Sequence, residues 1–161
     1  MKRWMVLLLT LIASPLLAAE KTSWQQDWER ILGAAKKEGK VAVTGPGGPE
    51  ARQTLVEPFE KKYGIAVDFF GASGRELSPR ILTERRAGRY LWDVYVSGTT
   101  TAIGVMIPQG AFDPLEPALV LPDVKDPNTW RGGALEFVDP GRSLLVTARG
   151  HRGTLFINPN L

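Results

Sequence analysis

The stretch that most constrains the fold is residues 65–101, which alternates short apolar segments with glycine-containing turns. Residues 65–70 are rich in β-branched and aromatic residues, and residues 93–96 form a second short segment of this kind. Between them, apolar residues recur at helical spacing over residues 77–82. A strand, a helix and a strand in this order form a βαβ crossover, and such crossovers build parallel sheets.

The residues before this stretch continue the alternation. Thr22 and Ser23 can cap a helix that ends at Gly39, and residues 40–44 read as a strand. A second helix is expected over residues 50–63, with Pro58 kinking or restarting it. We therefore predict an α/β fold with a central, mostly parallel sheet flanked by helices.

The second half of the chain has weaker patterns. We expect a short helix over residues 99–107, stopped by Pro108 and Gly110, and then an extended, proline-rich surface crossing. Residues 143–147 and 154–158 predict two more strands. A turn at residues 139–142, just before the first of them, is compatible with a hairpin.

Residues 1–19 have the pattern of a signal peptide. Lys2 and Arg3 precede an apolar core, and small residues before Ala19 suit cleavage. An uncleaved anchor is the alternative, but Ser14 and Pro15 interrupt an apolar run that is already shorter than the roughly 20 residues of a membrane helix. We expect an exported, periplasmic protein cleaved near Ala19, with residues 20–161 as its folded part.

Charge and composition point away from nucleic acid. The 161-residue chain has a formal net charge of +3, but without Lys2 and Arg3 only 18 basic residues face 17 acidic ones. The high pI is therefore only weak evidence for nucleic-acid binding. No nucleic-acid partner is therefore expected.

Three loops follow the three predicted strands and would share one edge of a parallel sheet, where ligands of open α/β sheets bind. They are the first loop (residues 45–49), the second loop (71–74) and the third loop (97–101). Glycine before a helix N-terminus lets an anion approach unpaired N–H groups, while hydroxyls and arginine add donors. The candidate ligand-binding residues are Gly45, Gly47, Gly48, Ser73, Gly74, Arg75, Ser97, Gly98 and Thr99.

Each loop also has a purely structural explanation. Glycine is a common turn residue, and Ser73 with Glu76 forms a capping box that needs no ligand. The first loop is neither a P-loop nor a dinucleotide fingerprint. Only the convergence of three such loops on one edge favours a ligand site.

Catalytic patterns are scarce, and no enzyme activity, cofactor or metal site is predicted. His151 is the only histidine, and no Ser-His-Asp or HExxH arrangement can be assembled. Glu84 and Asp93 are the candidate functional acids, but a surface ion pair and a strand-start hydrogen bond, respectively, explain them better.

From Trp28 to Leu161 the chain resembles the family 1 extracellular solute-binding proteins of ABC importers, a family that includes ferric-ion binders. The resemblance rests on the order and spacing of several segments: AKKEGKV at 35–41, FEKKYGI at 59–65, ERRAG at 84–88 leading to WDV at 92–94, GAFDPL at 110–115 and FINPNL at 156–161.

The resemblance implies a lobe of the type II periplasmic-binding-protein fold, with ligand held between two lobes and delivered to an inner-membrane permease. Family contacts would fall on residues 45–48, on Ser73 and Gly74, and on residues 97–99. The first loop has no metal-ligating side chain before Glu50, so we expect a small anionic solute in preference to a ferric complex. The chain corresponds to the first lobe alone, which suggests a fragment or a truncated product. A monomer is expected.

Two alternatives remain. One is an α/β enzyme acting on a phosphorylated or carboxylated small molecule, with Glu84 or Asp93 as base; a raised carboxylate pKa beside the loops would support it. The other is a truncated, non-functional exported remnant, which would fold poorly because its sheet edge is uncovered.

Overall fold

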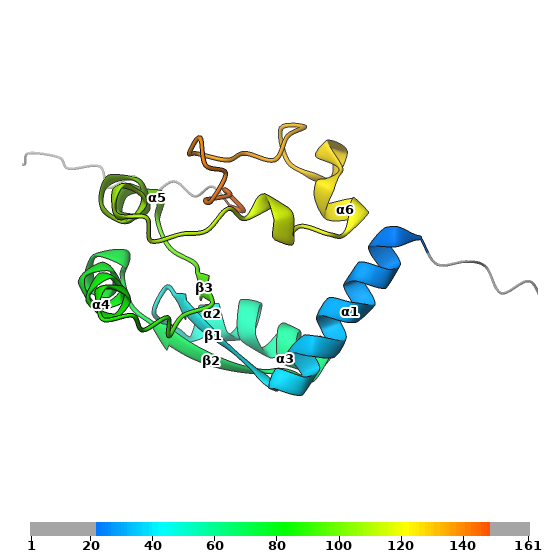
Figure 1. Ribbon diagram of the computed structural model, residues 1–161, viewed down its shortest axis with the longest axis horizontal. Helices are drawn as coiled ribbons and strands as arrows, with labels where there is room; N and C mark the ends of the chain where they lie inside the picture. Colours follow the sequence, from blue (N-terminus) through cyan, green and yellow to red (C-terminus); the bar gives the residue numbers. More distant parts are fainter. Residues whose placement is uncertain (1–21, 149–161) are drawn as a thin grey trace, which may run out of the picture.

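The computed structural model describes residues 22–148, which form a mixed α/β fold around a small parallel sheet (Figure 1). The coarse prediction of an α/β fold with a parallel sheet and flanking helices is confirmed. In chain order the elements are α1 (Ser23–Glu38), β1 (Lys40–Gly45), α2 (Pro49–Ala51), the π-helix η1 (Arg52–Val56), α3 (Glu57–Tyr63), β2 (Ala66–Gly71), α4 (Gly74–Arg86), β3 (Val94–Tyr95), α5 (Thr99–Thr101), the π-helix η2 (Ala102–Met106), the 3₁₀-helices η3 (Ile107–Gln109) and η4 (Glu116–Ala118), α6 (Pro122–Lys125), and the 3₁₀-helix η5 (Pro127–Thr129).

The sheet has the strand order β2-β1-β3, and both neighbouring pairs are parallel. Lys40 to Gly45 pair with Ala66 to Gly71, and Val43 and Thr44 pair with Val94 and Tyr95. The two crossovers run through helices, as parallel pairing requires. Because all three strands point the same way, their carboxyl ends share one edge.

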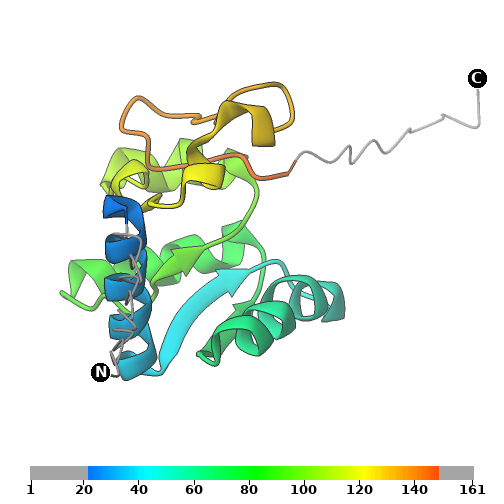
Figure 2. The same ribbon diagram turned by 90° about the vertical axis from the view of Figure 1, so that its right-hand side faces the viewer.

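The two faces of the sheet are covered by different helices. On one face, Ala51 and Val56 pack with Phe69 from β2, against the partly buried Val43 and Val67. The other core cluster joins α4 to η2 and the residues after it: Leu77, Ile81, Leu82, Met106 and Ala111. Residues 99–148 lie on the side of the molecule away from α2 and α3 in both views (Figures 1 and 2).

Two helices have the predicted caps. Thr22 and Gln25 form a capping box at the start of α1, and Gly39 ends it in the left-handed conformation with φ 76°. Ser73 and Glu76 form a second capping box at the start of α4. These boundaries follow from local sequence because a cap needs only residues within one turn.

Two prolines are each preceded by a π-helical turn. Pro58 follows η1 and Pro108 follows η2, each two residues after the π-helix ends. Proline has no N–H, and its ring collides with the carbonyl four residues back, so the preceding turn opens to i→i−5 bonds. The predicted restart at Pro58 is confirmed, because α3 begins at Glu57, directly after the π-helix η1. Of the two expected stops after residue 107, Pro108 is wrong because the helical path continues to Gln109, and Gly110 is confirmed because it ends that path in the left-handed conformation.

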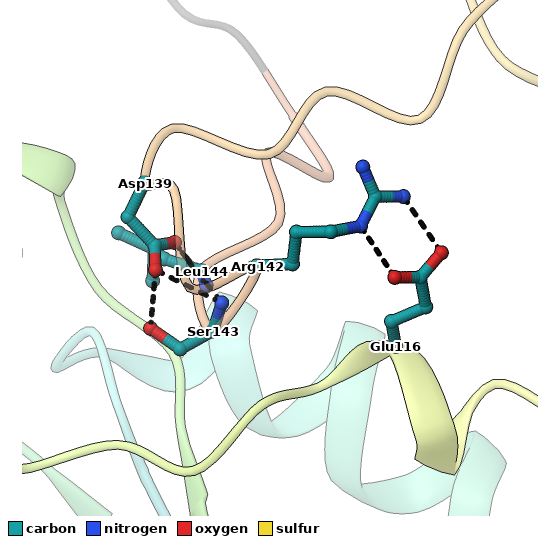
Figure 3. Close-up of polar contacts among 5 residues, drawn as sticks. All are labelled: Glu116, Asp139, Arg142, Ser143 and Leu144. Atoms are coloured by element: carbon teal, nitrogen blue, oxygen red, sulfur yellow. Dashed lines mark hydrogen bonds and ion pairs between the residues drawn. The ribbon is translucent and has the colours of Figure 1, made fainter.

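The predicted strand over residues 143–147 is also wrong, since only an isolated antiparallel bridge joins Phe137 to Leu145. The turn before it is present and begins at Asp139, whose carbonyl accepts the Arg142 N–H; Figure 3 shows the Asp139 side chain. The Asp139 carboxylate accepts hydrogen bonds from the N–H groups of Ser143 and Leu144. Its side chain thereby fixes a turn conformation at the start of the expected strand. The predicted strand over 154–158, His151 and the signal peptide at 1–19 lie outside the described residues.

Side chains close the outer edge of β2. Glu60 accepts the Val67 N–H at 2.8 Å, and Arg52 donates to the Phe69 carbonyl at 3.3 Å. These contacts occupy the groups through which another strand could pair. β3 is the other outer strand of the sheet, and there the Val94 side chain is 44% exposed.

Candidate functional site

The structure brings the three loops to the shared edge of the sheet, as the strand order requires. The first loop follows β1, the second follows β2 and the third follows β3. Because β1 is central, the first loop lies between the other two. All nine candidate residues therefore lie at this edge or on the first turn of the helix that leaves it.

The first and second loops pack against each other through glycine. A Cβ on Gly71 would lie 3.1 Å from the Gly47 Cα, and one on Gly45 would lie 2.7 Å from the buried Phe69 ring. Gly48 has φ 114°, which an L side chain rarely adopts. Packing and backbone geometry thus explain Gly45 and Gly48, whether or not a ligand binds.

The second and third loops meet at Gly74, which is buried. A Cβ there would lie 2.6 Å from the Tyr95 hydroxyl oxygen and 2.9 Å from Ser97 Oγ. The Tyr95 hydroxyl is buried, and it has no hydrogen-bond partner among residues 22–148. An unpaired buried hydroxyl costs about 1–3 kcal/mol. Tyr95 was not among the predicted site residues, because in the sequence it reads as an ordinary strand residue.

The polar groups of the second loop are used inside the loop. Ser73 Oγ accepts the Glu76 N–H and donates to the Glu76 carboxylate, which also accepts the Ser73 N–H. These hydrogen bonds, first from the Ser73 backbone and then from its side chain, hold the pKa of Glu76 below its ordinary value. Ser73 is therefore a capping residue, as its structural explanation predicted.

The polar groups of the third loop are free. Within residues 22–148, the side chains of Ser97 and Thr99 to Thr101 make no hydrogen bond, and Arg75 has neither a hydrogen bond nor an ion pair. Arg75 is exposed on the first turn of α4. A cation there opposes the helix dipole, so the helix itself does not explain it. Free hydroxyls and an unpaired guanidinium are suited to binding anionic oxygens.

The two candidate acids have structural partners. Glu84 accepts hydrogen bonds from Arg80 Nε and from the indole N–H of Trp92, both at 2.8 Å. The Arg80 bond lowers the pKa of Glu84, although burial opposes it and Trp92 assists. Asp93 accepts the Ala42 N–H at the start of β3. The ion pair and the strand-start hydrogen bond are confirmed, and the pKa of Glu84 is lowered, whereas the enzyme alternative needs it raised.

Neither of two hollows on the described surface is lined by any of the nine candidate ligand-binding residues, although Asp93 lines the larger of the two. One of about 590 Å³ lies towards the amino ends of the strands, between Lys40, Asp68 and Tyr90. The other, of about 230 Å³, lies beside the Asp139 turn, against Ile107 and Phe112.

No group of three or more histidine, aspartate or glutamate side chains within residues 22–148 is arranged to hold a metal ion. The helices of that same range are all too short or too polar to cross a membrane. The chain matches no protein-family model, and no curated protein or solved structure is significantly similar to it.

Proposed function

We propose that this chain is the first lobe of an exported solute-binding protein, and that the three loops contribute half of a site for a small anionic solute. The proposal is supported by the resemblance noted above and by the export signal in the sequence. The observation that carries it is the set of partner-free donors at the edge where three parallel strands end. Among residues 22–148 these are Arg75, Ser97 and Thr99 to Thr101.

The chemistry favours a carboxylate or phosphate-like oxyanion. Arg75 offers a planar, permanently charged fork that can bind two oxygens at once. The third loop offers hydroxyls, each of which donates one hydrogen bond. After capture, the loaded protein would deliver its solute to an ABC permease in the inner membrane.

The proposal is tested by calorimetric titration of the whole chain with inorganic phosphate, citrate and ferric citrate. We expect saturable binding of an anion without iron, weakened about tenfold or more in Arg75→Gln because a charged hydrogen bond is lost. Arg89→Gln is the matched control, since it removes the same charge near the far end of α4.

Three outcomes would count against the proposal. Binding of ferric citrate alone would contradict the anionic solute. Equal loss of affinity in both arginine variants would mean that only net charge matters, so that Arg75 has no specific role. Turnover of a phosphorylated or carboxylated probe by the purified chain would favour the enzyme instead.

A further inference from the structure

The Tyr95 hydroxyl is the one buried side-chain polar atom within residues 22–148 that has no hydrogen-bond partner. The ring is held firmly, because it packs against the cluster of Leu77, Ile81 and Met106 and lies 5.3 Å from the Phe112 ring between centroids. The packed ring therefore holds the hydroxyl at the junction of the second and third loops. Phenylalanine would fill the same space without leaving a hydroxyl unpaired.

Within the described residues, Ser97 has a free hydroxyl beside Gly74. Its Oγ and the Tyr95 hydroxyl oxygen lie 2.9 and 2.6 Å from the same point, the position of a Cβ on Gly74. Both oxygens therefore lie beside the same glycine, which has no side chain of its own. The two oxygens are not hydrogen-bonded to each other in this structure. A change of the Ser97 rotamer would move its Oγ relative to the Tyr95 hydroxyl, which the packed ring holds in place.

We infer that Tyr95 is a positioning residue of the proposed site: when an anion binds, the Tyr95 hydroxyl donates to Ser97 Oγ and thereby orients the Ser97 hydroxyl to donate to an oxygen of the anion. This inference rests on the proposed function. A serine hydroxyl has one proton and two lone pairs, so accepting from Tyr95 leaves its proton free for the ligand. Hydrogen bonds in such a chain polarise and strengthen one another. Tyr95 acts only through Ser97.

The test is a double-mutant cycle on the whole chain, with the dissociation constant for inorganic phosphate, or for citrate if phosphate does not bind, as the readout. Tyr95→Phe is expected to weaken binding about three- to tenfold, which is the effect of one hydrogen bond. In a Ser97→Ala background, Tyr95→Phe should change affinity less than about twofold, because the residue through which it acts is gone.

Stability supplies the second readout. Tyr95→Phe removes a hydroxyl that has no partner in the free protein, so its unfolding midpoint in urea should equal or exceed that of the wild type. Tyr90→Phe is the matched control, since Tyr90 is 70% exposed and lines the hollow towards the amino ends of the strands. It should change neither affinity nor stability.

Each result decides the inference. Unchanged affinity in Tyr95→Phe would overturn it while leaving the proposed function intact. An equal loss in both serine backgrounds would show that Tyr95 acts independently of Ser97, and would also overturn it. A lowered midpoint with unchanged affinity would assign the hydroxyl a purely structural role. If the wild type binds none of the anions, the proposed function fails and the inference falls with it.

Discussion

The second and third loops lie at the same edge of the sheet, but they use their polar residues in opposite ways. In the second loop, Ser73 and Glu76 satisfy each other and the N-terminus of α4. In the third loop, Ser97 and Thr99 make no side-chain hydrogen bond within the described residues. A small polar turn is therefore not by itself evidence for a ligand. What matters is whether its hydrogen-bonding groups are already occupied.

The glycines of the two loops differ in the same way. Gly74 is buried against Tyr95 and Ser97, whereas Gly98 has no heavy atom within 4 Å of where a Cβ would lie. Gly98 also has φ −65° and ψ 144°, a conformation that any residue adopts. Gly74 is thus required by packing, and Gly98 is not required by the described structure.

The largest expected effect concerns these two glycines. Gly74→Ala should lower the free energy of unfolding by about 1–3 kcal/mol, because the added methyl group overlaps two neighbouring side chains in a packed region. Gly98→Ala should stay within about 0.5 kcal/mol of the wild type. Urea unfolding followed by tryptophan fluorescence measures both. Equal costs would remove the distinction between the loops.

The first loop extends the comparison. Gly45→Ala should cost about 1–3 kcal/mol because its methyl group would overlap the buried Phe69 ring. Gly47→Ala is the control, since a Cβ there makes only ordinary contacts with Gly71, the nearest at 3.7 Å. A small effect at both positions, measured by the same urea titration, would show that the Phe69 ring moves aside easily.

The two serines should separate stability from binding. Ser73→Ala should destabilise the fold by about 1 kcal/mol, the usual effect of losing an N-cap. Ser97→Ala should leave stability within about 0.5 kcal/mol and reduce anion affinity. Thermal unfolding and calorimetric titration of both variants check this. A destabilised Ser97→Ala protein would mean that the third loop also has a structural role.

The smallest expected effect is a pH dependence of the second loop. The pKa of Glu76 is lower in the folded protein than its ordinary value of 4.5. Its contribution to stability is therefore complete above that value and is lost as the pH falls through the folded pKa. Glu76→Gln should flatten this part of a stability profile between pH 3 and 6, because glutamine does not titrate there. An unchanged profile would assign the acid sensitivity to other groups, such as Asp139.

Asp139 is one such group, and its pKa is shifted in the same direction as that of Glu76. Burial raises the pKa of Asp139, but hydrogen bonds from Ser143 and Leu144 outweigh burial and hold the pKa below its ordinary value. The turn in Figure 3 should thus also weaken in acid. The Asp139 carboxylate holds the N–H groups of Ser143 and Leu144 in the turn, at the first two positions of the expected strand.

Local sequence determined the elements whose causes are local. Apolar periodicity and the capping residues predicted α1 and α4, and alternating strand and helix patterns predicted the parallel sheet. The roles of Ser73, Glu84 and Asp93 could be anticipated as well, because a cap, an ion pair four residues apart and a strand-start hydrogen bond each need few neighbours.

Only the tertiary structure decided which loop residues have partners. Gly74 lies against Tyr95, which is 21 residues later in the chain, because β3 pairs beside β1, and no local pattern contains that contact. The same pairing leaves the Tyr95 hydroxyl buried and unpaired while Ser97 and Arg75 stay free. A chain specifies its helices over a few residues, but the availability of a donor depends on every group that folding brings near it.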